Sequence, residues 1–425
     1  MDNLKIRLSY GSLGNQQIGY YDFIQTITTK GSMSDYSFDG TVLGQHATVS
    51  DPVSGDQTWE KVVSKNLGLD LNMFNNRLSL TTDFYIRDTK GILGKGKSLP
   101  SIYGASEPQM NANNLRTKGY ELVLGWRDSF KLAGSTFSYG ITGTFSDYTA
   151  EYTKCDNPTG LIGDPYVGKK YGEIWGYKVD GLFRNNKEAA EYASRIDLST
   201  VASGYYTATG AYGKGVRGGD IKYLDLNGDN IVNGGKGTLD DPGDRRVIGN
   251  SSPRYQYGAS LNFSWYGFDV SVFMQGIGRL DWYPGADNLR FWGPYCRPYA
   301  TFVPKNFMSQ VWSEENPDAY FPRARAYTSL NSNSGTAYYT NDRYLQNLAY
   351  CRLKNLTIGY TIPRRLTSKV GIKECRIYFS GENLATWSAL KSDFLDPEQA
   401  AADSDKKANV YPWCKTYSIG LNLTF

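Results

Sequence analysis

The sequence predicts an all-β protein: an antiparallel transmembrane β-barrel wall of about ten strands. Three observations predict it. Apolar and polar residues alternate in one segment after another, the connections alternate between short and long, and aromatic residues and glycine are abundant. The 425 residues include 34 Tyr, 18 Phe, 9 Trp and 46 Gly, a composition that suits strands, interfacial aromatic belts and tight turns.

The last segment, residues 414–425, has the clearest alternation. Its side chains of one parity are apolar, and those of the other parity are small or polar. The apolar set is Tyr417, Ile419, Leu421, Leu423 and Phe425. Successive side chains of a strand point to opposite faces, so this segment has one apolar and one polar face. A soluble sheet with a core on one side and a barrel strand facing lipid both fit this single segment.

The same alternation predicts the earlier strands in order. In the first half of the chain it predicts strands at 4–11, 63–71, 78–86, 120–126 and 137–145. In the second half it predicts strands at 255–265, 270–274, 356–362 and 375–379, before the terminal one. Residues 187–195 are the one short stretch that favours a helix, and 89–116 are expected to form a loop of medium length.

The lengths of the connections favour a membrane barrel over a soluble sheet. In order they are long, short, medium, short, very long, short, long, short and long. In an up-and-down antiparallel sheet, alternate connections lie at opposite ends, so all the long ones gather at one end. Outer-membrane barrels have this asymmetry, with long extracellular loops and short periplasmic turns. Loops of more than about 15 residues are uncommon in compact soluble domains.

Charge, hydropathy and cysteine content exclude several classes. A net charge of +4 without a long basic run gives no reason to expect a nucleic-acid partner. The mean hydropathy is −0.48, and no apolar stretch approaches the roughly 18 residues of a spanning helix. Five scattered cysteines argue against a complete disulfide framework or a zinc site. The first residues contain no signal-peptide core and already read as a strand, so we expect residues 1–425 to be part of a longer barrel protein.

Several phrases resemble the SusC/RagA-type TonB-dependent outer-membrane transporters. They follow one another along the whole chain: LKIRLSYGSLGNQQIG near the start, NANNLRTKGYELVLGW, GEIWGYKVDGLF, GDIKYLDLNGDN, then DRRVIGNSSPRYQYGASLNFSWYGFDVSVFMQG and RLKNLTIGYTIPRRLTSKVGIKECRIYFSGENLATWS. The resemblance implies a barrel of about 22 strands, of which residues 1–425 would be the C-terminal part. The plug domain, the TonB-box segment and the first strands have no counterpart here.

The resemblance also implies a function. It implies an outer-membrane nutrient importer of a Gram-negative bacterium, embedded in the lipid bilayer. It would pass an oligosaccharide or peptide delivered by a SusD-like lipoprotein and be energised by TonB through the missing plug. No bond is made or broken in such transport, so we expect no enzyme, no catalytic residue and no cofactor. Two other hypotheses stay open: a self-contained small outer-membrane barrel and a soluble all-β glycan-binding module.

A tight loop in the longest connection is a candidate structural Ca²⁺ site. The candidate ligands are Asp225, Asn227, Asp229, the backbone carbonyl near Ile231, and Asp244 beyond an insertion. Alternating oxygen-bearing side chains can wrap a hard cation. Lys236 stands where an EF-hand has its closing acid, so Asp240 or Asp241 is an alternative to Asp244. A network of Asx turns without metal is the other interpretation. Either arrangement would stiffen an extracellular loop.

Other patterns carry less chemistry. Residues 91–98 match the phosphate-loop pattern, but Pro100 follows and no helix is expected, so we interpret them as a glycine-rich loop. The single His46 makes no triad or histidine metal site. Six aromatic residues of the long loops are candidates either for stacking on a substrate or for packing between loops. They are Trp175, Tyr177, Trp282, Tyr283, Trp292 and Tyr295.

Overall fold

A computed structural model gives the structure of the chain. It describes residues 1–15, 24–30, 37–38, 41–42, 46–50, 52–55, 57–95, 102, 104, 107–207, 215–296, 303, 305–325, 330, 335–392, 394–402, 411 and 413–425. Within these ranges, no helix combines the length and the apolar character needed to cross a membrane.

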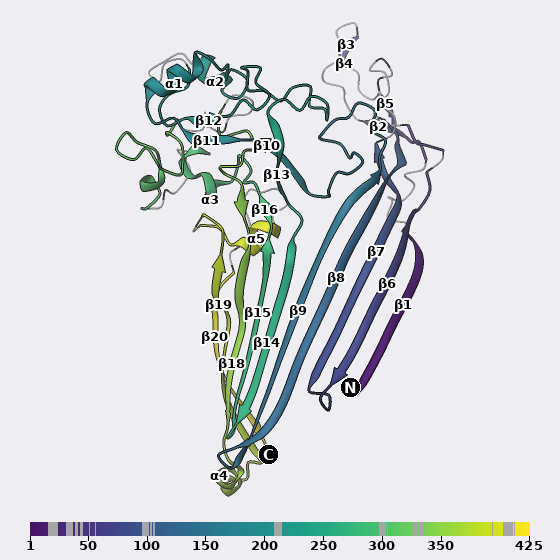
Figure 1. Ribbon diagram of the computed structural model, residues 1–425, viewed down its shortest axis with the longest axis vertical. Coiled ribbons are helices and arrows are strands. Elements are labelled where there is room, and N and C mark those ends of the chain that lie inside the picture. The colour runs from purple at the N-terminus through teal and green to yellow at the C-terminus, as the bar shows by residue number, and fades with distance from the viewer. Residues whose placement is uncertain are drawn as a thin grey trace.

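The chain forms one large antiparallel sheet of ten strands in the predicted order (Figure 1). The strands are β1 (Asn3–Asn15), β6 (Glu60–Met73), β7 (Leu78–Lys95), β8 (Gln109–Leu132), β9 (Ser135–Lys154), β14 (Arg254–Trp265), β15 (Phe268–Arg279), β18 (Tyr350–Thr361), β19 (Glu374–Ser388) and β20 (Thr416–Thr424). Each strand pairs with its neighbours in this order, and β1 and β20 lie at the two edges. The predicted fold class, an antiparallel all-β barrel wall, is confirmed.

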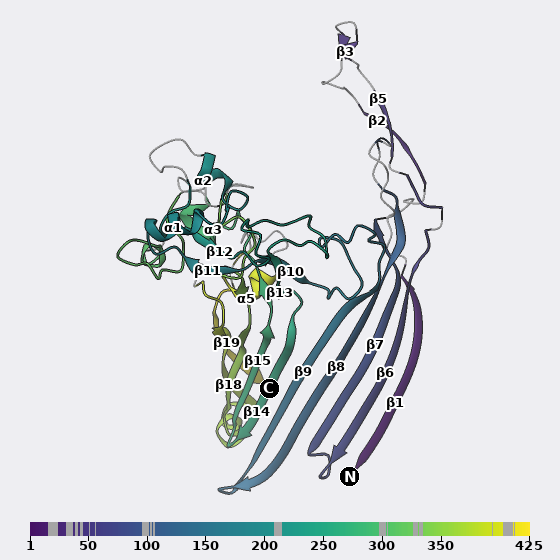
Figure 2. The ribbon, with the colours of Figure 1, turned by 45° about the horizontal axis from the view of Figure 1, so that its top comes forward.

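Long and short connections are sorted to opposite ends of the sheet, as predicted (Figures 1 and 2). The expected loop at 89–116 is mostly wrong, because β7 continues to Lys95 and β8 begins at Gln109. These strand ends carry charged and amide side chains instead of alternating apolar ones. They are held by cross-strand pairs such as Arg116 Nε to Asp88 Oδ1 at 2.7 Å, which a search for apolar periodicity does not detect.

Shorter elements fill the long connections. Small two-stranded sheets are made by β2 (Ile27–Lys30) with β5 (His46–Val49), β3 (Ser37–Phe38) with β4 (Thr41–Val42), β10 (Glu173–Tyr177) with β13 (Arg245–Asn250), β11 (Val179–Leu182) with β12 (Ile221–Tyr223), and β16 (Asp281–Trp282) with β17 (Gln346–Asn347). The helices are α1 (Asn186–Ala193), α2 (Ser203–Thr207), α3 (Leu289–Trp292), α4 (Arg364–Thr367), α5 (Pro397–Ala402) and the 3₁₀ turns η2 (Gly293–Tyr295), η3 (Met308–Gln310) and η5 (Ser368–Val370). The predicted helix at 187–195 is α1, with the Asn185 side chain accepting a hydrogen bond from the Glu188 amide at 2.9 Å.

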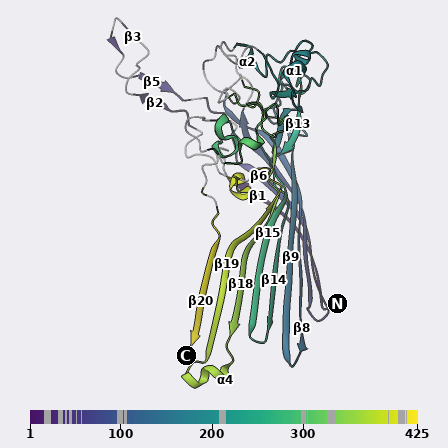
Figure 3. The same cartoon turned by 90° about the vertical axis from the view of Figure 1, so that its left-hand side faces the viewer.

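The two faces of the sheet differ in chemistry. One face carries the predicted apolar parity largely exposed, with Leu8 79% and Ile419 83% exposed, although Val63 and Cys375 of the same parity are only 8% exposed. The other face carries charges in cross-strand pairs, such as Arg7 Nε with Asp70 at 2.9 Å. Near the loop end, Arg352 of β18 lies on this charged face and donates to Glu398 of α5. The helix α5 therefore covers part of the charged face. We call the charged face the inner face and the apolar one the outer face; Figure 3 shows the curvature of the wall.

Glycines on the inner face lie beneath large side chains of the neighbouring strands. A Cβ on Gly68 would come within 2.7 Å of the Arg7 guanidinium carbon, and one on Gly420 would overlap the Tyr378 ring. Because a glycine leaves this space empty, each of these long side chains lies along the wall. Part of the high glycine content is therefore explained by the packing of the inner face.

Aromatic residues of the outer face form two belts. The belt toward the loops runs across four strands, with ring centroids 6.0–6.4 Å apart, through Phe84, Tyr120, Phe145 and Tyr255. The belt toward the tight turns includes Phe130, Phe137 and Phe263, with centroids 5.3 and 6.3 Å apart. On β8, Tyr120 and Phe130 are about 33 Å apart along the strand at ~3.3 Å per residue, or about 25 Å apart across a strand tilted by ~40°.

Candidate functional site

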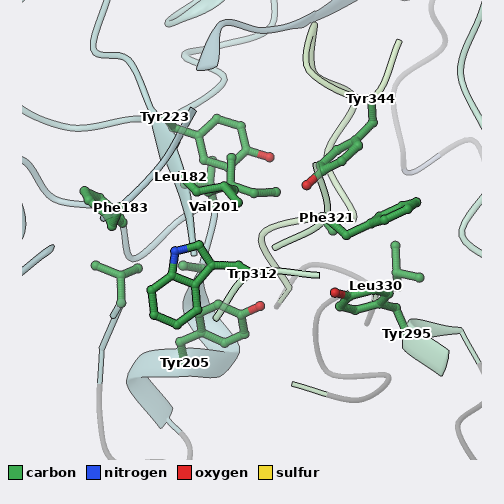
Figure 4. Packing of buried hydrophobic residues seen from close by; sticks show 14 of the residues in the cluster. Leu182, Phe183, Val201, Tyr205, Tyr223, Tyr295, Trp312, Phe321, Leu330 and Tyr344 are labelled. Carbon is green, nitrogen blue, oxygen red and sulfur yellow. The ribbon is translucent and has the colours of Figure 1, made fainter. Parts of the chain in front are cut away.

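The two longest described connections fold together into a unit with its own hydrophobic core, which we call the loop unit (residues 155–253 and 280–349). Its largest cluster of buried residues lies entirely between Tyr177 and Tyr344, outside the strands of the main sheet. Trp292, Tyr344 and Phe183 have no exposed side-chain surface. Figure 4 shows Phe183 and Tyr344 among the residues of this cluster. The rings of Trp292 and Tyr344 meet edge to face with centroids 5.0 Å apart. The loops at this end are therefore a packed body.

A buried ion pair joins two distant parts of the loop unit. Arg325 Nε donates to Asp220 Oδ1 at 2.9 Å, and the guanidinium lies 4.1 Å from the Tyr205 ring centroid. The exposed fractions of the Arg325 and Asp220 side chains are 5% and 1%. Burial raises the pKa of Asp220 to about 6, while the adjacent Arg325 charge acts in the opposite direction. Both carboxylate oxygens of Asp220 accept from the Arg325 guanidinium, which joins the two segments inside the loop unit.

The loop unit contains a cavity of about 590 Å³ with an aromatic and basic lining. Trp175, Tyr177 and Tyr283 contribute rings, and Arg245 and Lys236 contribute charge beside the glycines of residues 234–237. The Tyr283 hydroxyl donates to the Tyr339 carbonyl at 3.0 Å. Rings and backbone amides in one concavity can stack on a sugar ring or an aromatic side chain and hydrogen-bond its polar groups. This cavity is the candidate substrate site.

Most of the six loop aromatics named from the sequence are core residues. Five of them are at most 8% exposed: Tyr177, Trp282, Tyr283, Trp292 and Tyr295. Packing between loops is therefore the main role of this group. Trp175, Tyr177 and Tyr283 also line the cavity. Sequence reasoning missed Tyr338, Tyr339 and Arg245, which reach the same cavity from other segments; adjacent tyrosines in a long loop were the only signal.

The candidate cation loop forms a tight network of Asx turns. The Asp225 carboxylate accepts from the Gly228 and Asn230 amides at 2.7 and 2.9 Å. The Asp229 carboxylate accepts from the Ile231 amide at 2.8 Å, and the Asn227 side-chain oxygen accepts from the Asp229 amide at 3.1 Å. Asn230 takes φ +66°, the left-handed turn expected at this position. The three side chains thus converge on one small exposed loop.

Asp244 lies beneath this loop and is fully buried. Its two carboxylate oxygens accept from the Leu226 and Asn233 amides at 2.7 and 2.9 Å. Asp241 closes a separate turn by accepting from the Lys236 amide at 3.3 Å. No group of three or more His, Cys, Asp or Glu in the described ranges is arranged to hold a metal. Of the predicted ligands, Asp225, Asn227 and Asp229 thus lie on the loop itself, whereas Asp244 lies beneath it.

A second loop is tied to the inner face of the wall. Arg352 of β18, 1% exposed, donates to Glu398 Oε2 at 2.8 Å and also contacts Asp396 at the start of α5. Lys354 Nζ lies 2.8 Å from the same Glu398 oxygen. This network holds α5 against the inner side of the sheet near its loop end.

The end of the phosphate-loop pattern, residues 96–98, lies outside the described residues. Residues 91–95 continue the strand β7.

Comparisons with known proteins identify relatives across the whole chain. No family model matches it. TonB-dependent receptors P3 and P26 of Formosa agariphila are 26% and 27% identical over 99% of the chain. TonB-dependent receptor SusC of Bacteroides thetaiotaomicron is 22% identical over 100% of it. The chain spans about two fifths of the length of these relatives: 39%, 40% and 38%.

Solved structures give the same result for the fold. The RagAB peptide transporter superposes with a TM-score of 0.67 at 22% identity, covering 100% of this chain and 40% of that one. RagAB in its "open-open" state gives a TM-score of 0.66 at 21% identity, again with 100% and 40% coverage. The predicted resemblance to TonB-dependent receptors of the SusC/RagA type is confirmed.

Proposed function

Because its relatives are TonB-dependent receptors of the SusC/RagA type, we propose that this chain forms part of the wall and outer loops of an outer-membrane importer. We assign it to the C-terminal part of the barrel. We propose that coupling to TonB takes place through a plug domain outside residues 1–425. The relatives named above are receptors and transporters, and we propose that no bond is made or broken here either.

The observation that carries the membrane assignment is the outer face. Large apolar side chains are exposed on strands from β1 to β20, and on β8, β9 and β14 two aromatic belts lie about 25 Å apart. Exposing such an apolar surface to water costs a free energy of roughly 25 cal/mol for each Å². Lipid covers it without that cost, and the belt spacing matches the apolar band of outer-membrane barrels. The sorted loops then face the outside of the cell.

The loop unit and its cavity support the transport part of the proposal. A substrate class with rings and many polar groups fits the lining of Trp175, Tyr283 and Arg245. RagAB is described as a peptide transporter. An oligosaccharide or a peptide, delivered by a SusD-like lipoprotein that covers the outer loops, is the cargo we propose.

Uptake in the native host tests this proposal. A strain lacking the gene is complemented with the wild type, with Trp175→Ala, or with the matched wall variant Trp387→Ala, and its uptake of labelled peptide and oligosaccharide mixtures is measured. We expect uptake of one mixture to depend on TonB and to fall about two- to tenfold with Trp175→Ala only, since a stacking ring contributes about 0.5–1.5 kcal/mol. Uptake that is independent of the gene, or of TonB, would contradict the importer.

Two other functions are separated by simpler observations. A self-contained small barrel requires β1 to pair with β20, whereas the sheet has these two strands at opposite edges. In a soluble glycan-binding module, the outer face would be covered by protein, or the protein would stay monodisperse in water with that face exposed. Expression without detergent distinguishes this module from a membrane protein. A soluble monomer would favour the module, and aggregation would favour the membrane wall.

We also propose that the loop at 225–231 binds Ca²⁺ and thereby stiffens the loop unit. The support is the convergence of Asp225, Asn227 and Asp229 on one turn and the anchoring of that turn by buried Asp244. Protease resistance of the loop unit is compared with Ca²⁺ and with a chelator. Loss of resistance on chelation in the wild type, but no further loss in Asp229→Asn, is expected. Equal resistance in both conditions would leave only the Asx-turn network.

A further inference from the structure

Lysines gather on the outer face of the wall just beyond the aromatic belt at the loop end. Lys65 of β6 pairs in register with Ile86 of β7, and Ile86 pairs with Lys118 of β8. The neighbouring row toward the turns is Leu67, Phe84 and Tyr120. The transition from apolar belt to lysine therefore occurs within one row of side chains. Lys61 and Lys90, paired with each other, stand further out.

The acidic residues of this region are largely neutralised by arginines. Asp88 is bound by Arg116 at 2.7 Å, and Asp147 by Arg254 at 2.6 Å. Lys65 and Lys118 are exposed and make no ion pair or hydrogen bond with the described part of the chain. The positive charge of the two lysines is therefore available to an external anion.

A cavity lies along the same row. It has a volume of about 620 Å³ and is open to the outer face. Its apolar lining comes from Leu8, Leu67, Phe84, Ile86 and Tyr120. Its charged lining comes from Lys65, Lys118 and the ion pair of Arg254 with Asp147. An occupant that matches both parts has an apolar chain and an anionic head.

We propose that this groove is a binding site for a phosphate-bearing lipid of the surrounding leaflet. The acyl chain lies against Phe84 and Leu67, and the phosphate lies between the ammonium groups of Lys65 and Lys118. The belt at Tyr120 sets the depth, since aromatic belts lie at the level of lipid headgroups. A lysine near such a surface attracts anionic headgroups. This inference rests on the proposed function, because only a membrane wall presents this face to lipid.

Native mass spectrometry of the native protein in detergent tests the site. The micelles are supplied with lipid A carrying two phosphates or with the same lipid freed of phosphate. The wild type is expected to retain the phosphorylated lipid and to lose it as salt is raised. The double variant Lys65→Gln/Lys118→Gln is expected to bind it about tenfold or more weakly. Lys65→Arg/Lys118→Arg is expected to restore retention, since it restores charge.

A charge-matched control is Lys131→Gln/Lys369→Gln, which removes two lysines at the tight-turn end and is expected to leave retention unchanged. Each variant is checked for folding by heat-modifiable migration on a gel. Equal retention by wild type and Lys65→Gln/Lys118→Gln, or equal retention of the phosphate-free lipid, would overturn the site while leaving the importer intact. A wild type that is monodisperse without detergent would instead overturn the membrane wall and this site together. If the double variant fails to fold, retention of the phosphorylated lipid is measured for Lys118→Gln alone and for the wild type at rising salt. Retention that neither the single substitution nor salt reduces would overturn the site.

Discussion

The wall and the loop unit use the same residue types in opposite ways. In the loop unit Trp292, Tyr344 and Phe183 are fully buried and form a core. In the wall Leu8 and Ile419 project outward and are 79% and 83% exposed. A buried aromatic residue in the loop unit is stabilised by its neighbours, whereas an apolar residue of the wall is stabilised by whatever surrounds the sheet. Apolar residues of the same chain therefore lie in two environments, the protein core of the loop unit and the exposed outer face of the wall. The effect of a substitution depends on the region in which it lies.

The largest effect is expected from opening the core of the loop unit. Trp292→Ala removes a fully buried ring and its hydrogen bond to the Gly285 carbonyl, 3.0 Å away. We expect a loss of about 4 kcal/mol in the stability of the loop unit. The matched control is Trp387→Ala, because Trp387 is a wall residue that is 57% exposed. Pulse proteolysis in detergent measures both, and equal losses would erase the distinction between the two regions.

A slightly smaller effect is expected from separating the buried ion pair. Asp220→Ala leaves the Arg325 charge buried without its carboxylate, at a cost of about 3 kcal/mol. Asp88→Ala breaks the wall pair with Arg116, whose side chain is 43% exposed, and is expected to cost less than about 1 kcal/mol. Denaturant midpoints of the two variants give the comparison. A large cost for Asp88→Ala would mean that charges on the wall are less solvated than their exposure indicates.

The wall itself is tested by placing charge on each of its faces. Leu421→Arg puts a guanidinium on the outer face of β20, where an arginine at mid-depth in lipid costs about 2–4 kcal/mol. Asn422→Arg puts the same side chain on the inner face and is expected to be milder. The fraction of protein assembled in the membrane is the measurement. Equal assembly of the two variants would show that the faces have been assigned wrongly.

The smallest effect concerns the point where a loop meets the wall. Glu398→Gln weakens the contacts of α5 with Arg352 and Lys354 by about 1–2 kcal/mol, since bonds to charged groups are of this size. Amide hydrogen exchange in residues 394–402 is expected to be faster, while exchange in the strands is unchanged. Glu374→Gln, at the tight-turn end of β19, is the control. Unchanged exchange in Glu398→Gln would show that α5 is held by other contacts.

The order and direction of all ten strands were predictable from the sequence, because a period of two is imposed wherever one face must be apolar. The segment at 414–425 and its register with β19 illustrate this: the outer set of Leu421 and Leu423 pairs with Ile377 and Cys375. The outer ends of β7 and β8 were not predictable in this way. Where a strand extends beyond the apolar band, its two faces no longer differ in polarity.

The candidate site was only partly predictable. Asp244 was named from the sequence as a candidate ligand of the loop at 225–231, and its carboxylate accepts from the Leu226 amide at 2.7 Å, while its role as a metal ligand stays a prediction. The cavity was not anticipated, because Trp175, Arg245, Tyr283 and Tyr339 come from four separate segments. Their directions depend on how long connections pack on one another, which no local periodicity encodes.

The glycines beneath Arg7 and Tyr378 have a consequence for the width of the passage that such a wall would enclose. A long side chain standing upright would reach several ångströms toward the axis and narrow the bore. Lying flat over Gly68 or Gly420, the same side chain lines the passage without obstructing it. The clearance available to a bulky solute is therefore determined by the smallest residue in the sequence as well as by the number of strands.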